Sequence, residues 1–324
     1  MKTEAPLRDP QTLIEAVRYF ADPDVALRTM VELRWPQGVH CPTCGRTDVR
    51  FIATRRMWEC RERHPRKQFS AKVGTIFEDS PIDLGKWFAA IWMVANCKNG
   101  ISSYEMHRAL GVTQKTAWFM DHRIRLAMKT GTFLKMRGEV EADETFIGGL
   151  AKNMHRHQRT RKIKGTGGSG KEAVLGIVER GTEDSASRIK TVHIPNVRRK
   201  TLAPEIRATV EPGSTIYTDA LKSYLGLSDA YTHETVDHAV EFVRENVHTN
   251  NVENFWSLLK RALKGTYVSV DPVHLGRYLD EETFRFNERK DNDGGRFRKV
   301  VSSVTGKRLT YKELIADGGT PTTH

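Results

Sequence analysis

The stretch VEADETFIGG, residues 140–149, has the alternating pattern that is typical of a β-strand. Successive side chains of a strand point to opposite faces, so Glu141, Asp143 and Thr145 lie on one face. The glycines behind them let the chain turn away. We therefore expect a strand that presents the carboxylate of Asp143 on one face of a sheet.

Two further acids stand at informative places in the sequence. Asp219 comes at the end of STIYTDA, a β-branched run that is typical of a central strand. Glu253 lies in HTNNVENFWSLLKR, which has the apolar spacing of a helix capped by Asn250 or Asn251. Lys260 follows Glu253 by two helical turns, so both side chains share one face of that helix.

Carboxylates at strand ends are costly to bury unless a cation fills the gap between them. Two aspartates from neighbouring strands and a glutamate from a following helix can hold two Mg²⁺ ions about 3.5–4 Å apart. Such ions activate water or a 3′-hydroxyl for phosphodiester displacement without a covalent enzyme intermediate. Spacing alone leaves other acids open as alternatives, namely Glu141, Glu144 and Asp237, as well as purely structural roles for all of them.

The region between residues 35 and 77 contains short, turn-rich segments that cannot bury a large core. Its C-x2-C pair is followed by Gly45, and a Cys and a His supply a second pair. Structural Zn²⁺ takes four nitrogen or sulfur ligands in a closed tetrahedral shell, and such a site can stabilise a small fold. We expect a structural zinc site, with an exposed histidine as the alternative for the last residue of the set Cys41, Cys44, Cys60 and His64.

Residues 81–132 have a strongly helical pattern that includes the turn Leu110-Gly111-Val112-Thr113. Ser102 or Ser103 is expected to cap one helix and Thr113 the next. A helix-turn-helix protein contacts the major groove of DNA from the start of its second helix, which here carries Gln114, Lys115 and Thr116. Helix packing or subunit association is the alternative role for this pair.

Lys and Arg outnumber Asp and Glu by 52 to 40, which gives a net charge of +12 and favours a polyanionic partner such as nucleic acid. Ribosomal and membrane-surface proteins are also basic. The segment 151–171 has seven Lys or Arg residues, no acid and a Gly/Ser run, so we expect a mobile basic loop. Its candidate contacts to DNA phosphates are Arg159, Arg161, Lys162 and Lys164.

No apolar run reaches the roughly 18 residues of a membrane span, and the first residues lack the apolar core of a signal peptide. We expect a cytoplasmic, nucleoid-associated protein with no membrane partner. Four cysteines are too few for a disulfide scaffold at this length. Cys97 stands apart from the other three and is expected to be a half-buried helix residue.

The order of predicted elements favours a multidomain α+β protein. After Lys135 we expect three strands, a helix, two strands and further helices, in which Trp256 and Tyr267 either pack in the core or stack on bases. The expected parts are a helical cap at 1–34, a zinc ribbon at 35–80, a helix-turn-helix region at 81–132, an α/β catalytic domain at 135–290, and a basic, partly disordered tail at 291–324.

Several motifs in this order resemble those of the ISXO-type bacterial insertion-sequence transposases, over about residues 15–290. They are the Cys41-to-His64 ribbon, FSAKVGTIFEDSPI leading to KWF, GVTQKTAWFMDHRI, DETFIGG, YTDALKSY and HTNNVENFWSLLKR. The resemblance implies a ribonuclease H-like catalytic domain whose DDE triad maps onto Asp143, Asp219 and Glu253. Lys260 would match the basic residue that often follows the glutamate.

The same resemblance implies dependence on Mg²⁺ or Mn²⁺, cutting of double-stranded DNA at terminal inverted repeats, and strand transfer into target DNA. Cutting both ends needs two active sites or one used repeatedly, so we expect a dimer or larger homo-oligomer. This chain departs from many relatives with a zinc ribbon, which close the metal site with a second C-x2-C where this chain has Cys60-Arg-Glu-Arg-His64.

Two other functions fit parts of the sequence. A zinc-ribbon, helix-turn-helix regulator would bind DNA without cutting it, although a regulator has no need of all three acids. An RNA-processing nuclease would share the catalytic fold but would not require a helix suited to the major groove.

Overall fold

The computed structural model describes residues 10–129, 134–149, 170–219, 222–224, 226–236 and 248–316. The chain divides into two compact units, which we describe separately. Unit 1 comprises Met1–Thr130 and Asp291–His324, and unit 2 comprises Gly131–Lys290. Unit 1 is therefore built from both ends of the chain.

The helices of unit 1 surround an aromatic core. They are α1 (Leu13–Tyr19), α2 (Pro23–Arg34), α3 (Leu84–Asn96), α4 (Ser103–Leu110), α5 (Gln114–Met128), α10 (Asp293–Ser302) and α11 (Tyr311–Ile315). Helix α3 is buried along most of its length because its apolar residues recur on every side. Phe297 of α10 packs against Phe20, Phe88 and Trp92.

This packing includes part of the segment that the sequence predicts as a tail, 291–324. Its described part, up to Ala316, contains α10 and α11. Phe297, Val300 and Val301 are buried at helical spacing in α10. The many basic residues that favour a solvated tail occupy the other positions of this short amphipathic helix.

A small antiparallel sheet follows α2 in unit 1. Its strands are β1 (Val49–Ile52), β2 (Met57–Cys60) and β3 (Gln68–Phe69), with a 3-10 turn η1 (Ala53–Arg55) between the first two. The rings of Trp35, Trp58 and Phe69 contact one another on this sheet. Three aromatic residues make a core too small to stabilise this part alone, as expected from the sequence.

Unit 2 is built on a five-stranded mixed sheet with the order β6-β5-β4-β7-β8. Strands β4 (Glu139–Ile147), β5 (Glu172–Glu179) and β6 (Arg188–Ile194) pair antiparallel. Strands β7 (Thr215–Asp219) and β8 (Thr232–Val236) run parallel to β4. The central strand β4 therefore has β5 on one side and β7 on the other.

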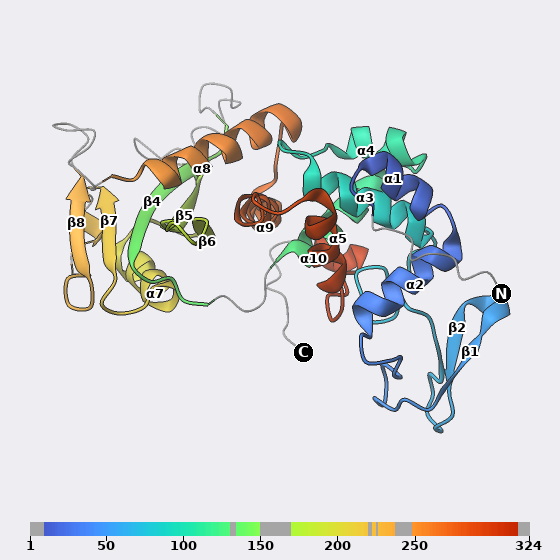
Figure 1. Cartoon of the computed structure of the whole chain (residues 1–324). Helices are drawn as coiled ribbons and strands as arrows, with labels where there is room; N and C mark the ends of the chain where they lie inside the picture. Colours follow the sequence, from blue (N-terminus) through green and yellow to red (C-terminus); the bar gives the residue numbers. More distant parts are fainter. Residues whose placement is uncertain are drawn as a thin grey trace. The chain divides into compact units, whose positions relative to one another are not determined.

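Helices cover both faces of this sheet (Figure 1). Helix α7 (Arg199–Thr209) packs with Leu175 and Ile177 on one face. Helices α8 (Asn250–Arg261) and α9 (Leu275–Asn287) pack with Val174 and Val178 on the other, because neighbouring side chains of β5 point to opposite faces. The remaining turns of helix are η3 (Lys222–Tyr224), the π-helix η4 (Ala262–Thr266) and η5 (Pro272–His274).

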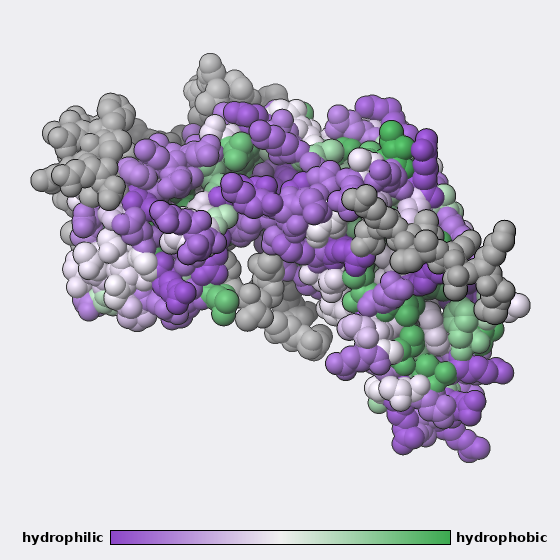
Figure 2. Space-filling view, viewed as in Figure 1, coloured by the Kyte–Doolittle hydropathy of each residue, from purple (hydrophilic) through white to green (hydrophobic). Residues whose placement is uncertain are grey.

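Hydrophilic residues predominate on the face of the molecule drawn in Figure 2. Within the described residues, no helix has the length and apolar character needed to cross a membrane.

Candidate functional site

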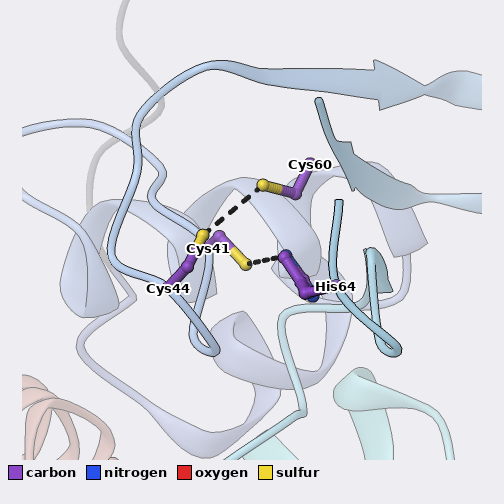
Figure 3. A group of neighbouring side chains, drawn as sticks. All are labelled: Cys41, Cys44, Cys60 and His64. Atoms are coloured by element: carbon purple, nitrogen blue, oxygen red, sulfur yellow. Dashed lines mark hydrogen bonds between the residues drawn. The ribbon is translucent and has the colours of Figure 1, made fainter. Parts of the chain in front are cut away.

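The four predicted zinc ligands lie together in unit 1 (Figure 3). Their ligand atoms all fall within 4.8 Å of one another. Cys44 Sγ is 3.6 Å from Cys60 Sγ, and Cys41 Sγ is 3.4 Å from His64 Nε2. A tetrahedral zinc ion with ordinary bond lengths places two sulfurs about 3.8 Å apart and a sulfur and a nitrogen about 3.5 Å apart. The cluster therefore fits a zinc ion, with His64 in the fourth position.

The backbone around the first cysteine pair also favours a metal thiolate. Gly45 has a φ of +75° and donates its N–H to the carbonyl of Cys41, which closes the tight turn. Burial raises the pKa of the Cys41 thiol, but hydrogen bonds from Cys44 and Thr43 outweigh this effect and lower that pKa to about 7. Cys97 lies outside the cluster, half-buried at the C-terminal end of α3.

The three predicted catalytic acids come from three neighbouring elements of unit 2. Asp143 lies on β4, Asp219 ends the adjacent parallel strand β7, and Glu253 lies in the first turn of α8. Among the described residues, only the zinc cluster has three or more ligand atoms within 4.8 Å of one another, so the acids are more widely spaced. Ions about 3.5–4 Å apart can be shared by carboxylates at such a spacing.

The charges of these acids act on one another. Burial, with smaller contributions from the negative charges of Asp219 and Glu253, raises the pKa of Asp143 to about 6 against hydrogen bonds from Trp256 and the backbone of Glu144. Accumulated negative charge in a partly buried site favours a cation. The residues therefore suit divalent ions, which prefer oxygen ligands.

Trp256 ties α8 to the sheet at Asp143. Its indole Nε1 donates to Asp143 Oδ2 at 2.9 Å. Gly176, the partner of Asp143 on β5, makes room for the indole, because a Cβ there would lie 2.6 Å from the Trp256 ring. Trp256 is thus a core residue that also holds one oxygen of a candidate metal ligand, and it is not placed to stack on bases.

Glu141, an alternative acid, holds the start of α8. Its side chain is fully buried, and its carboxylate accepts hydrogen bonds from the backbone N–H groups of Asn251 and Val252 at 2.9 and 3.1 Å. Arg180 Nε donates to the same carboxylate at 2.8 Å, and Arg180 also bonds the carbonyl of His248. These contacts occupy both oxygens of Glu141 and give it a structural role.

Glu144, another alternative, belongs to the opposite face of the sheet. Burial raises the pKa of its carboxyl to about 8, although the Tyr224 hydroxyl opposes the shift. Tyr224 belongs to the apolar core beneath α7. Asp237 lies outside the described residues.

The helices α4 and α5, predicted to bind DNA, begin at the capping residues that the sequence predicts. Ser102 caps α4 in a capping box, Gly111 ends it with a φ of +62°, and Thr113 caps α5. In the first turn of α5, Gln114 donates to Ser103 of α4, Lys115 lies over the ring of Tyr311, and Thr116 bonds the cap. Of the three, Lys115 is the most exposed.

The four predicted DNA contacts in the basic loop, Arg159, Arg161, Lys162 and Lys164, lie outside the described residues. Lys260 is half-buried in the last turn of α8, where it lines a pocket with Lys171 and Lys264.

The sequence matches two known families. Residues 135–287 match the ISXO2-like transposase domain, and residues 22–64 match a transposase zinc-ribbon domain. The second match begins before α2, which the sequence analysis assigns to a separate cap at 1–34.

Two similar proteins have names that point to mobile elements. One is an uncharacterized protein in transposable element ISH50 of Halobacterium salinarum, 27% identical over 259 residues, which cover 76% of this chain and 85% of that protein. The other is an uncharacterized transposase-like protein of Haemophilus influenzae, 36% identical over 102 residues, which cover 31% of this chain and 81% of that protein. No solved structure matches the chain.

Proposed function

Because the chain belongs to the ISXO2-like transposase family, we propose that it binds the terminal inverted repeats of an insertion sequence and cuts and transfers DNA strands in a metal-dependent reaction. Asp143, Asp219 and Glu253 are the proposed metal-binding acids, and Lys260 is the proposed basic residue beside them. The observation that carries this proposal is the meeting of β4, β7 and α8, each with one acid.

The sheet topology supports a ribonuclease H-like catalytic domain. Three antiparallel strands in sequence order are followed, on the other side of β4, by two parallel strands. The first acid lies on the central strand, the second at the end of its parallel neighbour, and the third on the helix that packs on the same sheet face as Asp143. The parallel pairing of β4 with β7, in which Glu141 is opposite Tyr217, puts Asp143 about level with Asp219 and supports a shared site.

In the proposed reaction, water attacks a phosphodiester, a bond forms between its oxygen and phosphorus, and the bond to the 3′-oxygen breaks. The released 3′-hydroxyl then attacks a target phosphodiester in the same way. Mg²⁺ or Mn²⁺ would activate the attacking oxygen and stabilise the leaving one. The three carboxylates would hold the ions, Trp256 keeps the Asp143 carboxylate in place, and Glu141 keeps the first turn of α8 against β4.

DNA recognition is proposed to come from unit 1 and from the basic residues. A structural zinc ion bound by Cys41, Cys44, Cys60 and His64 would stabilise the ribbon, and α4 and α5 would act as a helix-turn-helix. The net charge of +12 supports binding to a polyanion. A homo-oligomer would hold two element ends, and sedimentation with and without end DNA tests this.

The test is cleavage of a labelled duplex that carries the inverted repeat flanking the gene, in Mg²⁺, Mn²⁺ or EDTA. We expect metal-dependent cutting at the repeat boundary, and a loss of at least about 10³-fold in the Asp219→Asn variant with DNA binding retained. Asp229→Asn is the matched control, because Asp229 pairs with Arg207 on the surface of unit 2.

Cutting by the Asp219→Asn variant at the wild-type rate would disprove the assignment of this acid. Tight binding by both proteins without cutting in any metal would instead favour a regulator.

A further inference from the structure

The segment of unit 1 that follows α10, residues 303–316, runs along the helix α5. Its contacts move back along α5 as the chain advances, and they pair Lys307 with Ala127, Leu309 with Arg123, and Tyr311 with Phe119. The first two are hydrogen bonds of 3.0 Å, and the third is a ring contact with centroids 5.6 Å apart. Successive partners on α5 are about one helical turn apart. The segment therefore follows α5 from its end towards its start.

The position of Tyr311 is fixed by its neighbours in this segment. Thr310 and Glu313 form a capping box at the start of α11, which places Tyr311 in the first turn of that helix. Leu309 and Leu314, on either side of Tyr311 in the sequence, are both buried. These contacts give Tyr311 a defined position although α11 is only five residues long.

The ammonium group of Lys115 lies over the ring of Tyr311. Lys115 Nζ is 4.5 Å from the centre of the ring, within the range of a cation–π interaction. Lys115 is exposed in the first turn of α5, and among the described residues no carboxylate pairs with it. Glu313, the acid nearest to Tyr311 in the sequence, accepts hydrogen bonds from the backbone and the hydroxyl of Thr310. The cation is thus held by a neutral ring and remains available to an anion.

Lys115 differs in this respect from the two residues beside it. Gln114 donates its side-chain amide to Ser103, and Thr116 is bonded to the residue that caps α5. In a helix-turn-helix protein, the start of the second helix makes contacts with DNA. A contact between the first turn of α5 and a DNA phosphate therefore depends on Lys115.

The ring affects how strongly such a contact can form. A free lysine side chain loses conformational freedom when it binds a phosphate, and this loss weakens binding. A ring that already holds the ammonium group lowers that loss. The ring covers one side of the ammonium, which has three N–H donors, so donors on the other side remain for a phosphate.

We propose that Tyr311 is a positioning residue for DNA binding, because its ring holds the Lys115 ammonium where it contacts a DNA phosphate. The inference rests on the proposed function, in which α4 and α5 act as a helix-turn-helix. It adds residues 303–316 to the part of the chain that serves DNA binding. These residues lie outside both regions that match known families, 22–64 and 135–287.

The test is a double-mutant cycle, measured by fluorescence anisotropy with the full-length chain and no added Mg²⁺ or Mn²⁺. The labelled DNAs are a duplex of the flanking inverted repeat and an unrelated duplex of the same length. We expect Tyr311→Ala to weaken binding about three- to fivefold, the usual strength of an exposed cation–π contact. Tyr311→Phe keeps the ring and should bind as the wild type does. In a chain that already carries Lys115→Gln, Tyr311→Ala should have almost no further effect.

Lys115→Gln alone should reduce the slope of log affinity against log salt by about 0.9, because one phosphate contact is lost. Ile315→Ala is the matched control, since it removes an exposed apolar side chain one turn further along α11. It should change neither the affinity nor the slope. Thermal unfolding of each variant verifies that the fold is intact.

Additive losses in the Lys115 and Tyr311 variants, or an unchanged slope in Lys115→Gln, would overturn the proposal. Tighter binding by Tyr311→Ala would also overturn it, because the ring would then withhold Lys115 from DNA. A phosphate contact does not depend on base sequence, so the coupling should appear on both duplexes. Wild-type protein that binds the repeat no more tightly than the unrelated duplex would contradict the proposed function and leave this inference standing.

Discussion

The two candidate metal sites of this chain are built in opposite ways. The zinc cluster takes its ligands from one short segment, residues 41–64, and all four ligand atoms lie within 4.8 Å of one another. The acid site takes Asp143, Asp219 and Glu253 from two strands and a helix that are distant in sequence. The first site can assemble from local turns, whereas the second exists only when the whole sheet has formed.

The two sites also differ in the contacts that keep their ligands in place when no metal is bound. The pKa of the Cys41 thiol is lowered to about 7 and burial raises that of Cys60, so at neutral pH the empty cluster carries little negative charge. Burial and, to a smaller extent, the charges of the other two acids raise the pKa of Asp143, so other contacts must hold the acids in place. Glu141, Trp256 and Gly176 supply those contacts. A local site therefore depends on its metal for stability, and an assembled site depends on its scaffold.

Removal of zinc should have the largest effect. We expect Cys44→Ser to lose the metal and to unfold the region between residues 35 and 77, because structural zinc binding is worth on the order of 10 kcal/mol and little else stabilises this part. Elemental analysis should give one zinc per wild-type chain and none in the variant, and the fluorescence of Trp35 and Trp58 should report the unfolding. Cys97→Ser is the control and should keep its zinc.

The next largest effect is expected at Glu141, where substitution tests whether this acid has a structural role or binds metal. Glu141→Gln removes the buried one of the two carboxylates that pair with Arg180 and weakens the hold on α8, so we expect a loss on the order of 3 kcal/mol in the free energy of unfolding. Urea denaturation measures this loss. Glu139→Gln, which affects the exposed partner of the same arginine, should cost much less. Equal costs for both variants would contradict the scaffold role.

Glu144 should make stability depend on pH in the absence of a divalent ion. Its folded pKa of about 8 lies above its ordinary value of 4.5, so its protonated form is favoured in the fold. The resulting stability is fully present below about pH 4.5 and is lost progressively as the pH rises to the folded pKa of about 8, by on the order of 5 kcal/mol in all. Glu144→Gln should remove most of the decrease between pH 6.5 and 9 in urea denaturation in EDTA.

Glu183→Gln, in the exposed turn between β5 and β6, is the control for that measurement and should retain the wild-type decrease. Asp143, whose pKa is about 6, is mostly ionised at pH 6.5, so it contributes little to the decrease above that pH. A Glu144→Gln protein with the full wild-type pH dependence would contradict the assignment.

Loss of the tryptophan hydrogen bond should have the smallest effect. Trp256→Phe keeps an aromatic ring in the space above Gly176 but removes the donor to Asp143, so we expect cleavage to slow about tenfold. Cleavage assays over a range of Mg²⁺ concentrations measure it, and part of the loss should be recovered at high Mg²⁺. Trp118→Phe, in unit 1, is the control. A uniform loss of stability with an unchanged rate would assign Trp256 to packing alone.

Much of this architecture follows from local pattern in the sequence. The five strands of unit 2 and the helices α7, α8 and α9 lie where alternation and helical spacing predict them. The zinc ligands follow from a spacing of residues within one segment, and the caps at Ser102 and Thr113 follow from the chemistry of a helix start.

Local sequence patterns do not predict contacts between residues that are far apart in the chain. Glu141 meets Asn251 across 110 residues, and Asp143 meets Trp256 across 113, so no local period records either contact. One signal was present for the second, because Gly176 interrupts the β-branched run of β5, and an isolated glycine in a strand often marks a close approach. The helix α10 was not predicted, because its few apolar residues alternate with basic ones that favour a solvated tail.

The division of unit 1 between both ends of the chain has a consequence for synthesis. Phe297 packs on Phe20, Phe88 and Trp92, yet all of unit 2 is translated between them. At elongation rates of about 5–20 residues per second, the ribosome takes on the order of ten to thirty seconds to make that intervening stretch. During this interval the apolar residues of the first helices that contact Phe297 stay uncovered, and chaperones can bind them. Unit 2 has all of its own residues by then and can fold first.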